Sequence, residues 1–184
     1  MSKALFVDRK TIVKKSPLNG SVDPDKLMQY IELAQDIHIQ TQLGTDLYEK
    51  LQADIIAGTL AGNYETLVNT HIKPMLIHYS VMEYLHYAAY EVSNGGVFRH
   101  TPENAQLADK TEIDFLISKE KRTAEFYTER FNEYMRNNQR LFPEYLTNSN
   151  GDMYPSRKTD PTGWVLDRNN GSTFDRDFWG AGQS

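Results

Sequence analysis

A single glycine between two amphipathic patterns constrains the fold of this sequence more than any other feature. Residues 31–51 read IELAQDIHIQTQLGTDLYEKL. Before Gly44, apolar positions recur at three- and four-residue steps, as on one face of a helix, while Gln35 and Asp36 face outward. The expected buried positions are Leu27, Ile31, Ala34, Ile37 (or His38) and Thr41. A second apolar face follows the glycine, so the segment predicts a helical hairpin that must dock on something.

The ends of both helices are marked in the sequence. Asp23 can cap a helix that has Pro24 at its first position, where the missing N–H costs nothing. Gly44 tolerates the positive φ that ends a helix, and Thr45 can begin the next one. We therefore expect helices over about 24–42 and 45–57, the second closed by Gly58.

Two further helices are expected. One covers about 64–92, with a kink or break near Ile72 or Lys73 because Pro74 lies inside it. Its second half, MLIHYSVMEYLHYAAYEV, is apolar or aromatic on nearly every side, which is typical of a central core helix, and the sequence Asn94-Gly95-Gly96 is expected to end it. The other helix is expected to start at Thr101-Pro102 and to reach about 138.

The two ends of the chain differ from this helical middle. The sequence predicts an all-α fold: an extended N-terminal arm over 1–22, a bundle of about four main helices over 23–146, and a long irregular C-terminal tail over 147–184. The tail is rich in small and polar residues but contains both tryptophans. Spaced aromatic residues in such a segment suggest anchors for a partner, although the tail could instead fold back on its own core. The anchors are Tyr154, Trp164, Phe174, Phe178 and Trp179.

Composition narrows the possible functions. The chain has 184 residues, enough for one domain, and no cysteine, so disulfides, thiolate metal sites and cysteine nucleophiles are not available to it. A net charge of −5 without a dense Lys/Arg cluster argues against binding nucleic acid on its own surface. No signal peptide and no membrane span are recognised, so a cytosol-like compartment is expected.

One short motif could hold a metal. Glu83 and His86 form an E-x-x-H pair, and His78 could join them on the same helix face, as in di-iron bundles. Such a site needs a second E-x-x-H, which the sequence does not contain. Phosphate-binding glycine loops and hydrolase motifs are also missing. We expect no catalytic residue, cofactor or metal; the alternative is a helical-bundle metalloenzyme with a carboxylate/histidine site around Glu83 and His86.

The order of these parts resembles a known family. The hairpin pattern AQ....I...LG..LY..L, the later segments SNGGVF, AEFYTERFNEYMRNN and FPEY, and the polar aromatic tail are similar to the head-to-tail connector (adaptor) proteins of tailed bacteriophages. The likeness is greatest to the forms from phages that infect Bacteroidetes (crAss-like phages). It covers about residues 5–146, and its motifs are packing motifs.

The resemblance implies a structural virion protein, made in the host cytoplasm and located at the head–tail junction. Its partners would be the portal protein, neighbouring tail or ring proteins, and copies of itself in a ring of about twelve. Double-stranded DNA would pass through the channel without specific binding, since an acidic wall repels it. The hairpin would then provide scaffold and subunit contacts through Ile31, Gln35, Leu43, Gly44, Leu47 and Tyr48.

Overall fold

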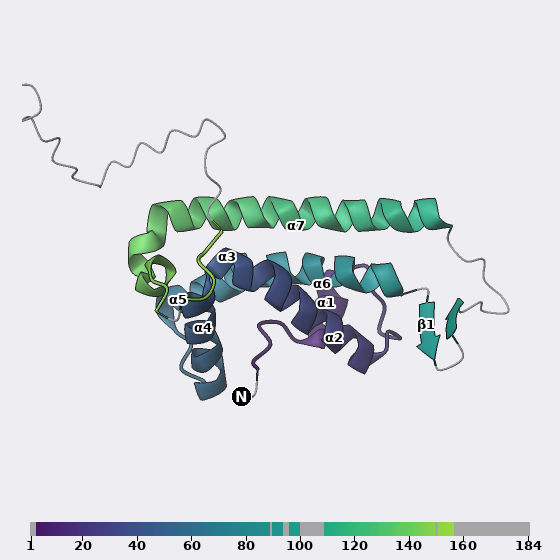
Figure 1. The fold of residues 1–184 in the computed structure, drawn as a ribbon, viewed down its shortest axis with the longest axis horizontal. Coiled ribbons are helices and arrows are strands. Elements are labelled where there is room, and N and C mark those ends of the chain that lie inside the picture. Colours follow the sequence, from purple (N-terminus) through teal and green to yellow (C-terminus); the bar gives the residue numbers. More distant parts are fainter. Residues whose placement is uncertain (1–2, 89, 94–95, 100–108, 150, 157–184) are drawn as a thin grey trace, which may run out of the picture.

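The fold is built around one long helix. The computed structural model describes residues 3–88, 90–93, 96–99, 109–149 and 151–156. These residues are mostly helical, which confirms the all-α class. Helix α7 (Lys110–Asn138) runs along the molecule, and α6 (Lys73–Tyr87) lies beneath it, between α7 and α2 (Pro24–Ala34) (Figure 1). Because it packs on both sides, α6 is the central helix that its apolar sequence predicts.

The helical hairpin and its caps are confirmed. Helix α2 continues through the π-helical turn η1 (Gln35–Gln40) and α3 (Thr41–Leu43), and α4 (Thr45–Ala57) follows. The Asp23 carboxylate accepts bonds from the N–H groups of the first turn of α2. Gly44 has φ +75°, and Gly58 ends α4 in the left-handed conformation. The glycines therefore supply backbone conformations that other residues rarely adopt.

The π-helical turn changes which residues of the first helix are buried. Ile37 is 49% exposed, whereas Ile39 and Gln35 are fully buried. The prediction that Gln35 faces outward is wrong because Gln35 follows Ile31 by four residues and shares its buried face, although its side chain is polar. The predicted stripe through Ile37 or His38 is wrong for a different reason. A π turn inserts an extra residue into the helix, so the buried positions after it no longer follow the α-helical period.

The third helical segment differs from its prediction at both Pro74 and its end. It consists of α5 (Gly62–Thr66), the π turn η2 (Leu67–Ile72) and α6, so the irregularity expected before Pro74 is a π turn. Helix α6 ends at Tyr87, and strands β1 (Tyr90–Ser93) and β2 (Gly96–Arg99) pair antiparallel. The expected helix to residue 92 is wrong, because Asn-Gly between two short runs is a hairpin signal as well as a helix stop.

Helix α7 begins later than the sequence suggests. Asp109 is extended and forms a capping box with Glu112, with bonds of 2.8 and 3.0 Å between the two residues. A continuous helix from 102 is therefore wrong. After Asn138 the chain turns through two short 3-10 helices, η3 (Gln139–Leu141) and η4 (Pro143–Leu146), which bring Phe142 and Tyr145 into the core.

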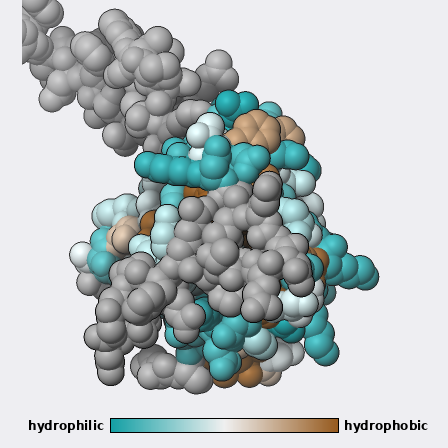
Figure 2. Space-filling model, turned by 90° about the vertical axis from the view of Figure 1, so that its right-hand side faces the viewer, coloured by the Kyte–Doolittle hydropathy of each residue, from teal (hydrophilic) through white to brown (hydrophobic). Residues whose placement is uncertain are grey.

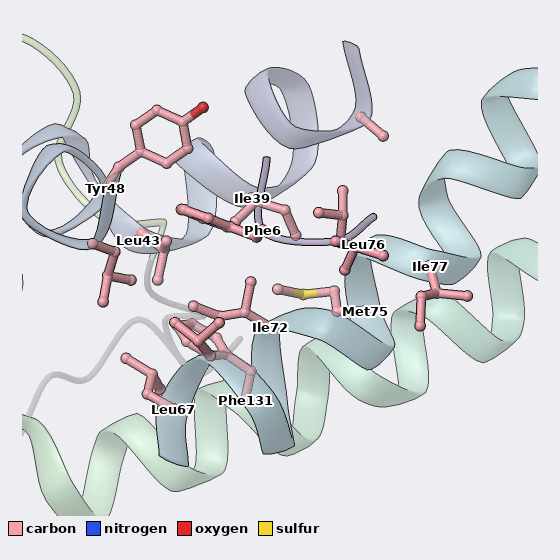
Figure 3. Packing of buried hydrophobic residues seen from close by; sticks show 14 of the residues in the cluster. Phe6, Ile39, Leu43, Tyr48, Leu67, Ile72, Met75, Leu76, Ile77 and Phe131 are labelled. Carbon is pink, nitrogen blue, oxygen red and sulfur yellow. The ribbon is translucent and has the colours of Figure 1, made fainter. Parts of the chain in front are cut away.

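The N-terminal segment is part of the core, and the expected extended arm over 1–22 is wrong. Residues 9–15 form helix α1 (Arg9–Lys15), and Phe6, Val7 and Ile12 are buried. Figure 3 shows Phe6 near Ile39 in the middle of the cluster. Around them lie core side chains from five further segments, among them Leu43, Tyr48, Leu67, Ile72, Met75 and Phe131 (Figure 3).

Candidate functional site

The structure separates the residues that could have formed a metal site. The Glu83 carboxylate is 2.9 Å from Nε2 of His38 on η1, while His78 Nδ1 is 2.7 Å from a carboxylate oxygen of Glu120 on α7. His86 is exposed near the end of α6. Among the residues that the structure describes, no three His, Asp or Glu side chains are grouped to hold a metal ion. The two His–Glu pairs instead join α6 to the helices on either side.

Three histidines stack on tyrosines in the same region. His38 lies 3.9 Å from the Tyr79 ring, with the two rings 4° from parallel. His71 stacks on Tyr134 at 4.2 Å, and His78 on Tyr127 at 5.5 Å. Burial, followed by the nearby charge of Arg130, lowers the pKa of His71. Nδ1 of His71 is buried without a hydrogen-bond partner among the described residues, so the His71 ring serves as a packing element between helices.

The residues expected to contact other subunits lie inside the chain. Ile31, Leu43 and Leu47 are fully buried, and Gly44 and Tyr48 are buried as well. Ile31, Leu43 and Leu47 are scaffold, and the prediction that these three also contact other subunits is wrong, whereas Tyr48 lines a surface pocket beside α4. Side chains that are already covered by their own chain leave no surface for a neighbour, so contact surfaces have to be sought elsewhere.

Gln35 has a specific structural task that periodicity alone did not reveal. Its side-chain oxygen accepts the N–H of Phe6 at 2.9 Å, and its amide nitrogen donates to the Ala4 carbonyl at 2.9 Å and to the Tyr48 hydroxyl at 3.0 Å. The Tyr48 hydroxyl donates in turn to Asp36. Burial raises the pKa of Tyr48. A primary amide can satisfy a backbone donor and acceptor together, which explains a buried glutamine here.

The first ten residues assigned to the tail form a clamp over the start of α4. We use this name for residues 147–156. Thr45 donates its N–H to the Met153 carbonyl at 2.9 Å and its hydroxyl to Asp152 at 2.8 Å. The Ser156 N–H donates to the Thr41 carbonyl at 2.8 Å. The domain boundary at 146 is therefore wrong, and for this segment the alternative of folding back on its own domain is correct.

A carboxylate and a glycine complete the clamp. Asp46 accepts bonds from the Thr147 hydroxyl and from the backbone and hydroxyl of Ser149, all within 2.8 Å. These bonds, that of Thr147 first, hold the pKa of Asp46 below its usual range. Pro155 is buried against Gly44, where an added Cβ would come 2.6 Å from the proline ring. The hairpin glycine therefore serves both the turn and the clamp.

The predicted aromatic anchors fall on both sides of the end of the clamp. Tyr154 is 66% exposed, so it is available to a partner. Trp164, Phe174, Phe178 and Trp179 lie outside the described residues. Ser156, the last described residue before them, lies near α3 and the middle of α7 and donates its N–H to the Thr41 carbonyl.

Large apolar side chains are exposed on several faces, and sequence reasoning missed most of them. Phe115 and Phe126 are exposed on α7, Leu33 and Ile37 on the first helix, and Ile56 on α4. The signal for the α7 pair was available, because phenylalanines eleven residues apart among charged residues share the outer face of a helix. Exposed positions of this kind are candidates for contact with another protein.

Comparison with known proteins gives a family without an assigned activity. The profile described as "Family of unknown function (DUF6712)" matches residues 39–154, from near the end of η1 into the clamp. No curated protein and no solved structure matches the chain. In the part of the chain that the structure describes, no helix has the length and apolar character needed to span a membrane.

Proposed function

For a chain that belongs to this family of unknown function, DUF6712, we propose the role of a structural subunit in a virion, a head-to-tail connector that forms a ring beneath the portal. The observation that carries the proposal is the exposure of large apolar side chains on α7, on the first helix and on α4. Surfaces of this kind on several sides suit a subunit with a neighbour on each side and a third partner above or below. The resemblance of residues 5–146 to connector proteins supports the same role.

The clamp adds a second line of support. A ring subunit that holds its neighbours through a flexible or extended segment gains from fixing where that segment begins, since less freedom is lost when it docks. Residues 147–156 fix this point through their bonds to Thr41, Thr45 and Asp46. In the proposed assembly, Trp164, Phe174, Phe178 and Trp179 then anchor the segment after Ser156 on a neighbouring subunit, the portal or a tail protein.

The DNA channel would make no specific demand on the subunit. The net charge of −5 gives a surface that repels duplex DNA, which must slide past without being held. The enzymatic alternative finds less support, because Glu83 and His78 are each paired with a residue of a different helix and His86 is exposed near the end of α6. Metal analysis of the purified protein tests it, and stoichiometric metal lost in Glu83→Ala would favour the enzyme.

The decisive experiment is imaging of the portal vertex. Purified full-length protein is mixed with a purified bacteriophage portal ring and examined by electron microscopy. The proposal expects a ring of about twelve copies coaxial with the portal. A matched variant with Trp164 and Trp179 both changed to alanine should keep the helical spectrum of the wild type but bind the portal at least tenfold more weakly. A monomer or dimer that ignores the portal would overturn the proposal.

A further inference from the structure

The outer face of α7 carries two cations between two aromatic side chains. Phe115 and Phe126 are 68% and 56% exposed. Eleven residues are about three helical turns, so the two rings share one face roughly 16 Å apart. Lys119 and Arg122 lie between them and are also exposed. Figure 2, in which α7 lies at the top, shows hydrophobic side chains at the surface there beside hydrophilic ones. We call these four residues the α7 ridge.

The cations of the ridge are not neutralised within the described part of the chain. Neither Lys119 nor Arg122 forms an ion pair with another described residue, whereas Lys121, on the side of the helix, pairs with Glu125 at 3.9 Å. An arginine beside exposed aromatic rings has the composition of an energetic centre in a protein interface. The ridge therefore has the character of a docking surface for an acidic partner.

A two-fold pairing of two ridges does not bring an acidic surface to the two cations. In an antiparallel pair, Phe115 of one copy would meet Phe126 of the other, but Lys119 would then lie beside Arg122. Like charges placed opposite each other in an interface cost free energy and disfavour the pairing. The surface that accepts the ridge must combine acidic groups with an apolar hollow.

The same chain offers such a surface beside α4. A surface pocket of about 620 Å³ lies between the N-terminal segment, α4 and the clamp. Tyr48, Ala53 and Ile56 give it an apolar side. Three carboxylates, those of Asp36, Glu49 and Asp152, line it together with Lys3; Asp36 pairs with Lys3, Asp152 accepts from Thr45, and Glu49 also has a partner within the chain. We call it the α4 pocket. Its described lining has more acidic than basic side chains, which complements the two cations of the ridge.

We propose that the α7 ridge of one copy docks into the α4 pocket of the next copy. Helix α4 lies under the C-terminal end of α7, while the ridge lies in its N-terminal half, so the two surfaces belong to different ends of the molecule (Figure 1). Unlike surfaces make a heterologous contact, which propagates from copy to copy and closes into a ring when the rotation allows. The choice of a second copy as the occupant rests on the proposed function.

The absence of cysteine allows a direct test, since every introduced thiol is unique. Full-length Ser118→Cys, beside the ridge, is mixed with full-length Ala53→Cys in the pocket and treated with a short bis-maleimide. Covalent dimers are expected in the mixture and not in either variant alone. Asn137→Cys is the matched control, because it is exposed on the same outer face but lies beyond the ridge. Its mixture with Ala53→Cys should give at least tenfold less dimer.

Charge reversal separates a lost contact from a lost fold. Arg122→Glu in the Ser118→Cys chain should reduce the mixed dimer at least tenfold, and Glu49→Arg in the Ala53→Cys chain should restore it. Dimers of Ser118→Cys alone at the rate of the mixture would indicate two-fold pairing and overturn the proposal, as would equal yields with Asn137→Cys. Portal-bound rings that do not form this crosslink would contradict the proposed interface and support the proposed function. A protein that forms the crosslink but does not bind the portal would support the interface and contradict the proposed function.

Discussion

Gly44 is the residue on which the hairpin and the clamp both depend. Its φ of +75° and ψ of +160° belong to a region that is essentially restricted to glycine, and a Cβ would meet the Pro155 ring at 2.6 Å. We expect Gly44→Ala to lower the free energy of unfolding by roughly 3 kcal/mol, measured by chemical denaturation. Gly58→Ala is the matched control, because Gly58 also has positive φ but open space around it, and it should lose only about 1 kcal/mol.

Part of the stability lost in Gly44→Ala comes from the clash with Pro155 and can be measured separately from the backbone strain. Pro155→Ala removes the ring atoms that the new Cβ would meet, so the double variant should be less destabilised than the sum of the two single variants. Additive losses would show that backbone strain at Gly44 accounts for the whole effect and that the contact with Pro155 contributes nothing.

His71 should make the stability of the protein depend on pH. Burial, followed by the charge of Arg130, lowers the pKa of His71 in the folded state. Unfolding returns the imidazole to its ordinary pKa near 6.5, so below that pH the unfolded chain binds the proton more tightly and the free energy of unfolding falls as pH is lowered. Denaturation at several pH values checks this. His71→Gln should flatten the dependence below pH 6.5, and an unchanged slope would assign it to other groups.

At the scale of single elements, the N-terminal segment depends on η1. Gln35 satisfies the backbone N–H of Phe6 and the carbonyl of Ala4 inside the core. Gln35→Ala leaves both groups without these bonds, so we expect a loss of roughly 2–4 kcal/mol in the free energy of unfolding and faster proteolysis at Lys3 and Arg9. Gln29→Ala, at an exposed position of α2, should change neither. Normal protection of the segment in Gln35→Ala would contradict this role.

The elements also show where sequence reasoning succeeded and where it failed. The start of α2 and the limits of α4 were predicted because Asp23, Pro24, Gly44 and Gly58 act on their own turns. The burial of Ile39 was missed because a π turn changes the phase of a helix without a composition signal, and that of Gln35 because its polarity was taken to place it outward. The clamp was missed for a different reason. Thr45 and Asp152 are 107 residues apart, and no local pattern relates them.

At the scale of the whole molecule, several polar contacts join elements that are far apart in the sequence. Two His–Glu pairs join α6 to its neighbouring helices, and Tyr64 donates to Glu144 across the core at 2.7 Å. Burial, followed by this bond to Glu144, raises the pKa of Tyr64 to about 12. The clamp closes the same end of the domain over α4. A domain fastened in this way presents its outer faces as fixed surfaces, which suits a subunit whose work is to contact others.

The contribution of the clamp to stability can be measured by truncation. A protein that ends at Ser156 retains the clamp, so its free energy of unfolding should be within about 0.5 kcal/mol of the full chain. A protein that ends at Leu146 loses the bonds to Thr41, Thr45 and Asp46 and the cover over Gly44, so it should lose roughly 2–4 kcal/mol. Denaturation curves of the three proteins give both values.

Only the full chain is expected to join the portal, because the shorter proteins lack Trp164 and Trp179. Normal assembly of the protein that ends at Ser156 would show that these aromatic residues are dispensable. Equal free energies of unfolding for all three proteins would show that the clamp does not stabilise the domain.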